Sequence, residues 1–316
     1  MPSPDLTIAI AVLDDYQNAA RRFANWAPVE TRASLTFFHD HRADVDAVIA
    51  RLLPFDAVCV MRERTPLARE VLERLPRLKL IVSTGTRNAV VDTVFAKERG
   101  IDVAFTEYRS DPTIEMTWSL ILGASRHLAV ENASLRAGGW QTTVGTGLRG
   151  KTLGLLGLGR VGSEVARVGQ AFGMNIITWS PHMTPERAAE HGATAVDRST
   201  LFARSDVLSI HLVLGRTTRG LVGTEELALM RPDALLVNTS RGPLVQEAAL
   251  VDALRARRLG GAALDVYDVE PLPADHPFRT LDNVLGTPHI GYVADDLYRT
   301  FYGDTVTALL RWLSSR

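Results

Sequence analysis

The chain has 316 residues, of which 46% are apolar and 22% are charged, and its 35 Lys and Arg residues nearly balance 36 Asp and Glu residues. This length allows two domains of about 150 residues, and a net charge of −1 without a basic stripe argues against nucleic-acid binding. No apolar run approaches the ~20 residues of a membrane span. No membrane association and no metal site are expected, and a single cysteine without an export signal favours the cytoplasm.

Strand-like and helix-like segments alternate from the start of the chain. Apolar runs typical of buried strands occupy residues 7–13, 57–61 and 78–84. Helical periodicity appears between them, for example at 45–52 and 68–75. This alternation predicts an α/β fold with parallel strands and right-handed crossovers.

A long helical pattern follows at residues 112–137 and ends in the glycine pair 138–139, which is typical of a helix C-terminus. We expect this helix to bridge two domains. A second series of strand-like runs then begins and is long enough for a complete doubly wound sheet; its runs lie at 152–156, 175–179, 206–210, 234–238, 260–264 and 283–285. The amphipathic segment 296–313 is too short for a third domain, so we expect it to pack on the first domain or the hinge.

The strongest local motif is "GLGRVG", which contains Gly157, Gly159 and Gly162 at the spacing G-x-G-x-x-G. It follows an apolar strand and opens an amphipathic helix, the context that a dinucleotide-binding loop requires. The first glycine permits a tight turn, the second lets the backbone approach a pyrophosphate, and the third lets the helix pack on the strand. The helix N-terminus then offers N–H groups to the phosphates.

The choice between NAD and NADP stays open. In NAD binders an acidic residue usually ends the second strand and accepts the ribose hydroxyls. Here that place holds Ser180, which neither repels a 2′-phosphate nor fixes a 2′-hydroxyl as a carboxylate does. His182 or Arg187 would supply positive charge nearby.

Three polar side chains follow the later strands of this series. Arg241 comes after one strand, Glu270 shortly after the next, and His289, in "TPHIG", after the last. Ligands of open parallel sheets bind beyond the carboxyl ends of the strands, so the three residues are expected to meet in one crevice. Arginine holds a carboxylate through two hydrogen bonds, histidine exchanges a proton with an alcohol oxygen, and a nearby carboxylate favours the imidazolium. This set predicts hydride transfer on a 2-oxoacid or 2-hydroxyacid.

The ordered motifs "GLGRVG", "NTSRG", "LDVYDVEP" and "TPHIG" resemble the D-isomer-specific 2-hydroxyacid dehydrogenases over nearly the full length of the chain. The resemblance implies that Arg241 binds and polarises the substrate, that His289 is the acid/base and that Glu270 is its partner. It also implies that Asp265 holds the nicotinamide amide. The remaining residues implied to line the cofactor site are Arg160, Val161, Leu212 and Thr239.

The resemblance also implies the architecture. It places a flavodoxin-like substrate domain at residues 1–114, an inserted Rossmann NAD(P)-binding domain at 115–290, and a C-terminal helix at 291–316 that returns to the substrate domain. Both domains are expected to be doubly wound parallel sheets. Members of the family are commonly homodimers, so a homodimer is expected here.

One loop departs from the family pattern. The substrate loop usually reads G-x-G with an aspartate two residues later, whereas this chain has Gly85, Thr86, Arg87 and, in place of the aspartate, Ala89. By resemblance, backbone N–H groups around Thr86 and Arg87 hold the substrate carboxylate, and the Arg87 side chain changes the room and charge there. The alternative is an arginine that points to solvent.

The sequence therefore predicts an NAD- or NADP-dependent dehydrogenase that transfers a hydride between nicotinamide and a 2-oxoacid or (R)-2-hydroxyacid. The alternative is a dehydrogenase-like protein that senses NAD(H) and regulates a partner. The motifs do not identify which hydroxyacid is used.

Overall fold

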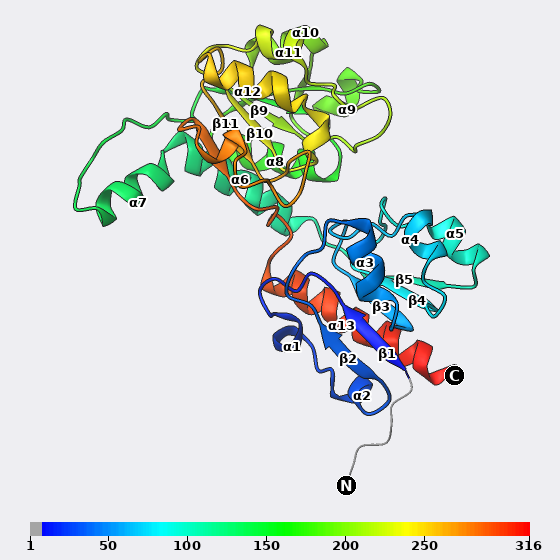
Figure 1. The fold of residues 1–316 in the computed structure, drawn as a ribbon. Coiled ribbons are helices and arrows are strands. Elements are labelled where there is room, and N and C mark those ends of the chain that lie inside the picture. The colour runs from blue at the N-terminus through cyan, green and yellow to red at the C-terminus, as the bar shows by residue number, and fades with distance from the viewer. Residues whose placement is uncertain (1–7) are drawn as a thin grey trace. The chain divides into compact units, whose positions relative to one another are not determined.

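The computed structural model describes residues 8–316, which form two compact units (Figure 1). Unit 1 comprises the chain up to Arg109 together with Val293–Arg316, and unit 2 comprises Ser110–Tyr292. The beginning of the first expected strand, at Thr7, lies outside the described residues.

Unit 1 contains a five-stranded parallel sheet with the strand order β2-β1-β3-β4-β5. This order is that of flavodoxin-like folds. The strands are β1 (Ala9–Val12), β2 (Ser34–Phe37), β3 (Ala57–Val60), β4 (Leu80–Ser83) and β5 (Asp102–Phe105). Its helices are α1 (Ala20–Phe23), α2 (Ala27–Glu30), α3 (Val45–Leu52), α4 (Arg69–Glu73), α5 (Thr93–Glu98) and α13 (Asp295–Ser314).

The burial of the strands explains why only three of them stand out as apolar runs. Every residue of the inner strands β3 and β4 is buried, and so is most of β1. The edge strands β2 and β5 expose about half of their residues. An edge strand with one covered face has a mixed composition, so its hydrophobic pattern is weak.

Helix α13 belongs to unit 1, although it comes at the end of the chain. It contacts α1, α2 and β4. It buries Leu297, Phe301, Leu309 and Leu313, which recur at spacings of four and eight residues and so share one face of the helix. None of the helices in residues 8–316 is long and apolar enough to cross a bilayer.

Unit 2 contains a seven-stranded parallel sheet with the order β12-β11-β10-β9-β6-β7-β8. The strands are β6 (Thr152–Leu156), β7 (Asn175–Trp179), β8 (Thr194–Ala195), β9 (Val207–Ile210), β10 (Leu235–Asn238), β11 (Gly261–Leu264) and β12 (Val284–Gly286). The order reverses at β6, which lies between β9 and β7, and ligands of such sheets bind at this switch point. The prediction of two doubly wound parallel sheets is therefore confirmed.

Helices cover both faces of this sheet. On one face α6 contacts α8 and strands β10 to β12, and on the other α10, α11 and α12 contact one another. The helices are α6 (Asp111–Ser125), α7 (Leu128–Arg136), α8 (Arg160–Ala171), α9 (Pro185–Ala189), α10 (Arg198–Arg204), α11 (Thr224–Leu229) and α12 (Glu247–Arg255), with short 3₁₀ helices η1 (Gly242–Leu244) and η2 (Pro277–Arg279). Two hydrophobic clusters fill the two faces.

The expectation of one long helix over residues 112–137 is wrong. The helix stops at Ser125, His127 adopts a left-handed conformation with φ of 51°, and α7 starts again at Leu128. Helix α6 buries residues against the sheet along its whole length, whereas α7 buries none, and Figure 1 shows α7 projecting from the body of unit 2. Without a packing partner for its second half, the helix is free to bend where tertiary contacts end.

Candidate functional site

The loops that follow β6, β9, β10, β11 and β12 carry the polar residues that the sequence singled out. All of these strands are parallel, so their carboxyl ends share one edge of the unit 2 sheet. The edge therefore collects the glycine loop, Arg241, Asp265, Glu270 and His289 into one region of a single unit.

The glycine loop has the geometry that its spacing requires. Gly157 has φ of +102°, and a Cβ atom there would lie 2.7 Å from the carbonyl oxygen of His211. A Cβ on Gly162 would lie within 2.2 Å of the Gly157 carbonyl oxygen. Gly159 caps α8 and faces open space, with no atom within 4 Å of its Cβ position. The first and third glycines thus allow close packing, and the second leaves room for a ligand at the helix N-terminus.

His211, which sequence reasoning did not single out, lies directly beneath this loop. Its backbone carbonyl is the atom closest to Gly157, and one ring nitrogen lies 2.8 Å from the Ser209 hydroxyl. Burial lowers the pKa of the imidazole to about 4, so the ring is neutral at pH 7. Its position directly after a strand was the one feature of the sequence that could have indicated a place at the site.

Ser180 directly follows β7, as the strand assignment predicts, and it is partly buried. Its carbonyl oxygen accepts a hydrogen bond from the Met183 backbone. The nearby side chains of His182 and Arg187 are exposed, and the Arg187 guanidinium donates to the His182 carbonyl oxygen at 3.2 Å. The end of β7 therefore presents a hydroxyl and exposed cationic groups rather than a carboxylate.

His289 and Glu270 are brought together. The Nδ1 atom of His289 lies 2.5 Å from one carboxylate oxygen of Glu270, and both side chains are partly exposed, at 22% and 33%. The other oxygen of Glu270 accepts the Tyr267 backbone N–H at 2.9 Å. Glu270 is thus held at both oxygens, and the Nε2 atom is the ring nitrogen of His289 that remains for a ligand.

The backbone around His289 is held by Asp265, which immediately follows β11 and is 1% exposed. One Asp265 oxygen accepts the Thr287 hydroxyl at 2.6 Å and the Ile290 N–H at 2.8 Å. The other accepts the Gly291 N–H at 2.7 Å. Burial raises the pKa of the Asp265 carboxyl, while these hydrogen bonds oppose the rise.

These hydrogen bonds flank a strained residue. His289 has φ of 52°, a left-handed conformation that is uncommon for residues other than glycine. A Cβ atom on Gly291 would lie 2.9 Å from the Asp265 carboxylate, which explains the glycine after "TPHI". Sequence reasoning by resemblance gave Asp265 a ligand contact; the structure also shows that it fixes the histidine loop.

Arg241 lies three residues beyond β10, at the same sheet edge as the His289–Glu270 pair. Its Nη1 atom donates to the Ser240 carbonyl oxygen at 2.6 Å, and its own carbonyl oxygen accepts the Asn238 side-chain amide at 2.9 Å. Thr239 is buried, and its hydroxyl lies 2.7 Å from that of Thr117 on α6. The Leu212 carbonyl oxygen accepts the Ser240 hydroxyl at 2.6 Å, which ties the loops after β9 and β10 together.

The expected substrate loop lies in unit 1, after β4. Gly85 has φ of +86°, and its N–H donates to the Thr106 hydroxyl at 2.8 Å. Thr86 and Arg87 are exposed. This loop is also at a carboxyl edge, that of the five-stranded sheet.

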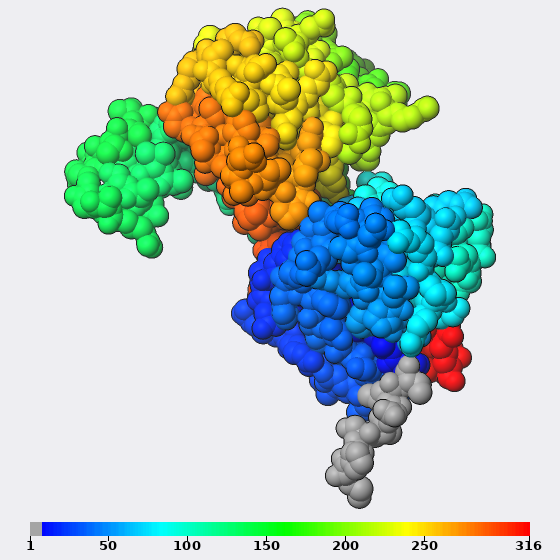
Figure 2. Space-filling view, viewed as in Figure 1, coloured from blue at the N-terminus to red at the C-terminus, as the bar shows by residue number. Residues whose placement is uncertain are grey.

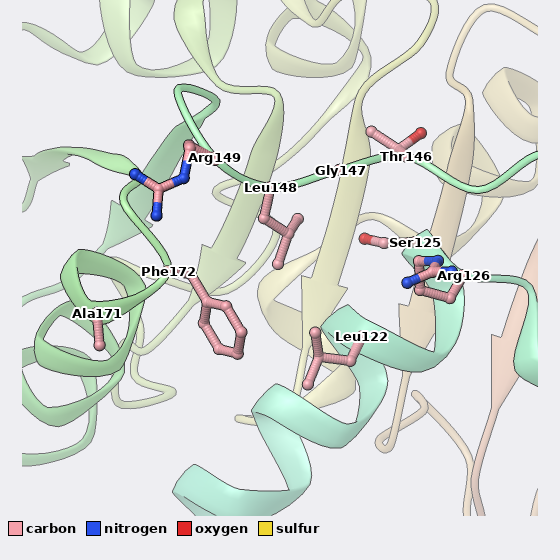
Figure 3. A pocket seen from close by; sticks show the side chains of 9 residues that line it. All are labelled: Leu122, Ser125, Arg126, Thr146, Gly147, Leu148, Arg149, Ala171 and Phe172. Carbon is pink, nitrogen blue, oxygen red and sulfur yellow. The ribbon is translucent and has the colours of Figure 1, made fainter.

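A separate hollow of about 330 Å³ lies in unit 2 beside the ends of α6 and α8 (Figure 3). Leu122, Leu148 and Phe172 line it, and the arginines Arg126 and Arg149 stand at its sides. Its residues end the helices or precede β6, so it lies at the amino edge of the sheet, away from the candidate site.

Comparison with known proteins relates the chain to one family. The NAD binding domain of the D-isomer specific 2-hydroxyacid dehydrogenases matches residues 118–291. The chain is 39% identical over 233 residues to the glyoxylate reductase of Thermococcus litoralis, a match that covers 71% of this chain and 70% of that one. It is also similar to the crystal structure of a phosphoglycerate oxidoreductase from Vibrio cholerae, with 39% identity and a TM-score of 0.92, over 98% of this chain and all of that chain.

A further relative is longer. The D-3-phosphoglycerate dehydrogenase of Methanocaldococcus jannaschii is 39% identical over 261 residues, which make up 80% of this chain and 50% of that protein. The chain thus spans about half the length of this curated relative.

The anchoring role of Asp265 predicts the effect of Asp265→Asn. Asparagine keeps the size of the side chain, but it replaces one accepting oxygen with an NH₂ group that faces a backbone N–H or the Thr287 hydroxyl. We expect a loss of about 1–3 kcal/mol in the free energy of unfolding, measured by chemical denaturation. Asp268→Asn, in the neighbouring loop, is the control; an equal loss in both variants would contradict the anchoring role.

Proposed function

The chain belongs to the D-isomer specific 2-hydroxyacid dehydrogenase family, and we propose that it is an NAD(P)-dependent enzyme that transfers a hydride between nicotinamide and a 2-oxoacid or (R)-2-hydroxyacid. The observation that carries the proposal is the His289–Glu270 pair at the same sheet edge as the open helix N-terminus at Gly159. A proton-transfer group fixed beside a dinucleotide loop favours a reaction over the sensing of NAD(H) alone.

The glycine loop fits a bound dinucleotide. The open space at Gly159 would admit a pyrophosphate against the N–H groups of α8, including those of Arg160 and Val161. We assign Leu212, Thr239 and Asp265 to the nicotinamide side of the same site; the second oxygen of Asp265 accepts only one protein hydrogen bond, which leaves it able to accept a carboxamide N–H. When bound, the nicotinamide supplies or accepts the hydride.

His289 supplies the proton in the direction of reduction. Its Nδ1 is engaged by Glu270, so Nε2–H donates to the carbonyl oxygen of the substrate as that oxygen becomes an alcohol. The contact with the Glu270 carboxylate keeps the plane of the ring fixed. In the oxidation direction the neutral ring takes the proton back.

Arg241 binds the substrate carboxylate through two hydrogen bonds and polarises the carbonyl group beside it. A guanidinium carries five N–H donors, so Arg241 can bind the substrate while Nη1 keeps its hydrogen bond to the Ser240 carbonyl oxygen. By resemblance, backbone N–H groups around Thr86 and Arg87 also bind a substrate carboxylate, whereas the Gly85 N–H already donates to the Thr106 hydroxyl. Two hydrogen bonds to the carboxylate orient the carbonyl group beside it, and the face that this group turns to the nicotinamide sets the configuration of the product.

The proposal is tested by absorbance at 340 nm with NADH or NADPH and a panel of 2-oxoacids. His289→Ala and Arg241→Ala should each lower kcat by about 10²–10⁴-fold, since acid catalysis alone contributes that much. Cofactor binding, followed by nucleotide fluorescence, should survive because neither residue belongs to the glycine loop. His191→Ala removes an exposed histidine of the same unit as the control. Near-normal turnover in either site variant would overturn the mechanism.

Cofactor preference depends on Ser180 in this proposal. Its hydroxyl can donate to a 2′-phosphate, and no carboxylate of the β7 end repels one, so we expect NADPH to be accepted at least comparably to NADH. Ser180→Asp restores both the ribose hydrogen bonds of NAD and the repulsion of phosphate. The ratio of kcat/KM values should move toward NADH by about 1.5–3 kcal/mol at most. Strict NADH dependence in both proteins would indicate that His182 or Arg187 reads the ribose instead.

We further propose a homodimer in which α7 and the loop after it contact a second copy. Figure 2 shows this arm, residues 128–144, projecting from the rest of unit 2. Its exposed large apolar side chains are Leu128, Val130, Leu135, Trp140 and Val144. Trp140 is 74% and Val144 93% exposed. Apolar surface gathered in this way marks an interaction site, and a twofold pair covers both arms at once because each arm meets the same surface of the other copy.

The arm predicts the oligomeric state. The chain should elute as a dimer, and the variant with Leu135→Ser and Trp140→Ser should dissociate into folded monomers, as measured by light scattering after size-exclusion chromatography. Val94→Ser removes an equally exposed apolar side chain from α5 of unit 1 and should leave the dimer intact. A dimer that survives the arm substitutions would place the interface elsewhere.

A further inference from the structure

Three arginines follow the strands at the carboxyl edge of the unit 1 sheet, and their surroundings differ. The Arg62 guanidinium lies 5.0 Å from the centre of the Tyr108 ring and is only 14% exposed. Arg64 donates to the Asp14 carbonyl oxygen at 2.6 Å and lies over the ring of Tyr16. Arg87 is exposed, and within residues 8–316 its side chain has no ion pair, hydrogen bond or ring contact.

The loop that carries Arg87 is firmly held. The Asn88 amide donates to the Arg62 carbonyl oxygen at 2.6 Å and to the Ser83 hydroxyl at 3.0 Å, and Asn88 is buried. The Thr84 hydroxyl accepts the Arg62 N–H at 2.8 Å. Hydrogen bonds on both sides therefore fix the backbone from which the Arg87 side chain extends.

Close packing of Gly85 against Arg62 also holds this loop in place. A Cβ atom on Gly85 would lie 1.7 Å from the Arg62 guanidinium, so the backbone at Gly85 and the side chain of Arg62 are in tight contact. The N–H groups of Thr86 and Arg87 have no acceptor in the described part of the chain. The loop thus combines two free backbone donors with one uncompensated cation, which is an arrangement suited to an anionic ligand.

We propose that Arg87 determines substrate specificity by binding a second anionic group, so that the preferred substrates are 2-oxoacids that carry a distal carboxylate or phosphate. The inference rests on the proposed function. The N–H group and the guanidinium of one arginine are separated by the whole side chain, so they contact different parts of a ligand. With the backbone donors of this loop on the carboxylate next to the carbonyl, the guanidinium is left for a group at the other end.

The chemistry of the side chain supports this assignment. A guanidinium presents a planar fork of donors that matches both carboxylate and phosphate. Since Arg87 has no partner in the protein to give up, binding a second anion breaks no internal ion pair. The same feature disfavours substrates with an apolar tail, which would leave the charge unpaired while covering it from water.

The test compares steady-state kinetics for pyruvate, oxaloacetate and 3-phosphohydroxypyruvate in the full chain and three variants. Arg87→Ala removes the guanidinium, Arg87→Lys keeps the charge without the fork, and Arg74→Ala is the matched control. Arg74 is an exposed arginine of the same unit that ends α4 at the opposite edge of the sheet, where it pairs with Asp46. Circular dichroism and thermal unfolding establish that each variant is folded.

Arg87→Ala should lower kcat/KM for the preferred dianionic acid by about 10- to 100-fold relative to pyruvate, mainly through KM, because a charged hydrogen bond is lost on binding. Arg87→Lys should recover part of the loss, and Arg74→Ala should leave the ratio unchanged. The acid that loses more in Arg87→Ala identifies the distal group as carboxylate or phosphate.

Two negative results are distinguishable. If the unmodified chain reduces no 2-oxoacid with either cofactor, the proposed function fails. If it reduces pyruvate but Arg87→Ala changes kcat/KM equally for all three acids, or for none, the role of Arg87 is overturned while the proposed function stands.

Discussion

The geometry of the candidate site in unit 2 depends on the buried carboxylate of Asp265. The carboxylate accepts three hydrogen bonds from residues 287–291 and so holds the chain on both sides of His289. These contacts stabilise the left-handed backbone conformation of His289, which is unfavourable for a residue with a side chain. That conformation directs the imidazole to Glu270. Burial raises the pKa of Asp265, which is a cost to folding, and the hydrogen bonds to its two oxygens offset part of that cost. The His289–Glu270 pair is thus positioned by a second carboxyl group, that of Asp265, which faces the backbone.

The rest of the site follows from strand order. Because all seven strands of unit 2 are parallel, every loop after a strand opens at the same edge, and the reversal of order at β6 separates the loops on either side of the glycine motif. Gly157 and Gly162 allow β6, α8 and the loop after β9 to pack closely. Gly159 has open space beside it, which leaves the N-terminus of α8 accessible. The glycine loop and the His289–Glu270 pair therefore share one edge of the sheet, while the hollow near Phe172 lies at the opposite edge.

Two exposed features of the chain, the arm at residues 128–144 and Arg87, are suited to binding another molecule. The arm at residues 128–144 exposes apolar side chains that its own unit does not cover, and the helix bends at His127 where its contacts with the sheet end. The second feature is Arg87, a cation on a firmly held loop that has no side-chain partner within residues 8–316. An uncovered apolar face favours association with protein, whereas an unpaired cation on a fixed loop favours a small anion.

The sequence by itself determined the α/β class, the two parallel sheets, the glycine loop and the order Arg241, Glu270, His289, because periodicity and spacing along the chain record local geometry directly. It could not reveal the edge strands β2 and β5, whose half-exposed faces weaken the apolar pattern. Nor could the sequence locate the break at His127. The helical pattern continues through this position, and the helix ends only because its contacts with the sheet end there. The contacts of Asp265 with residues 287–291 join segments more than 20 positions apart, and such contacts exist only once β11 and β12 are paired.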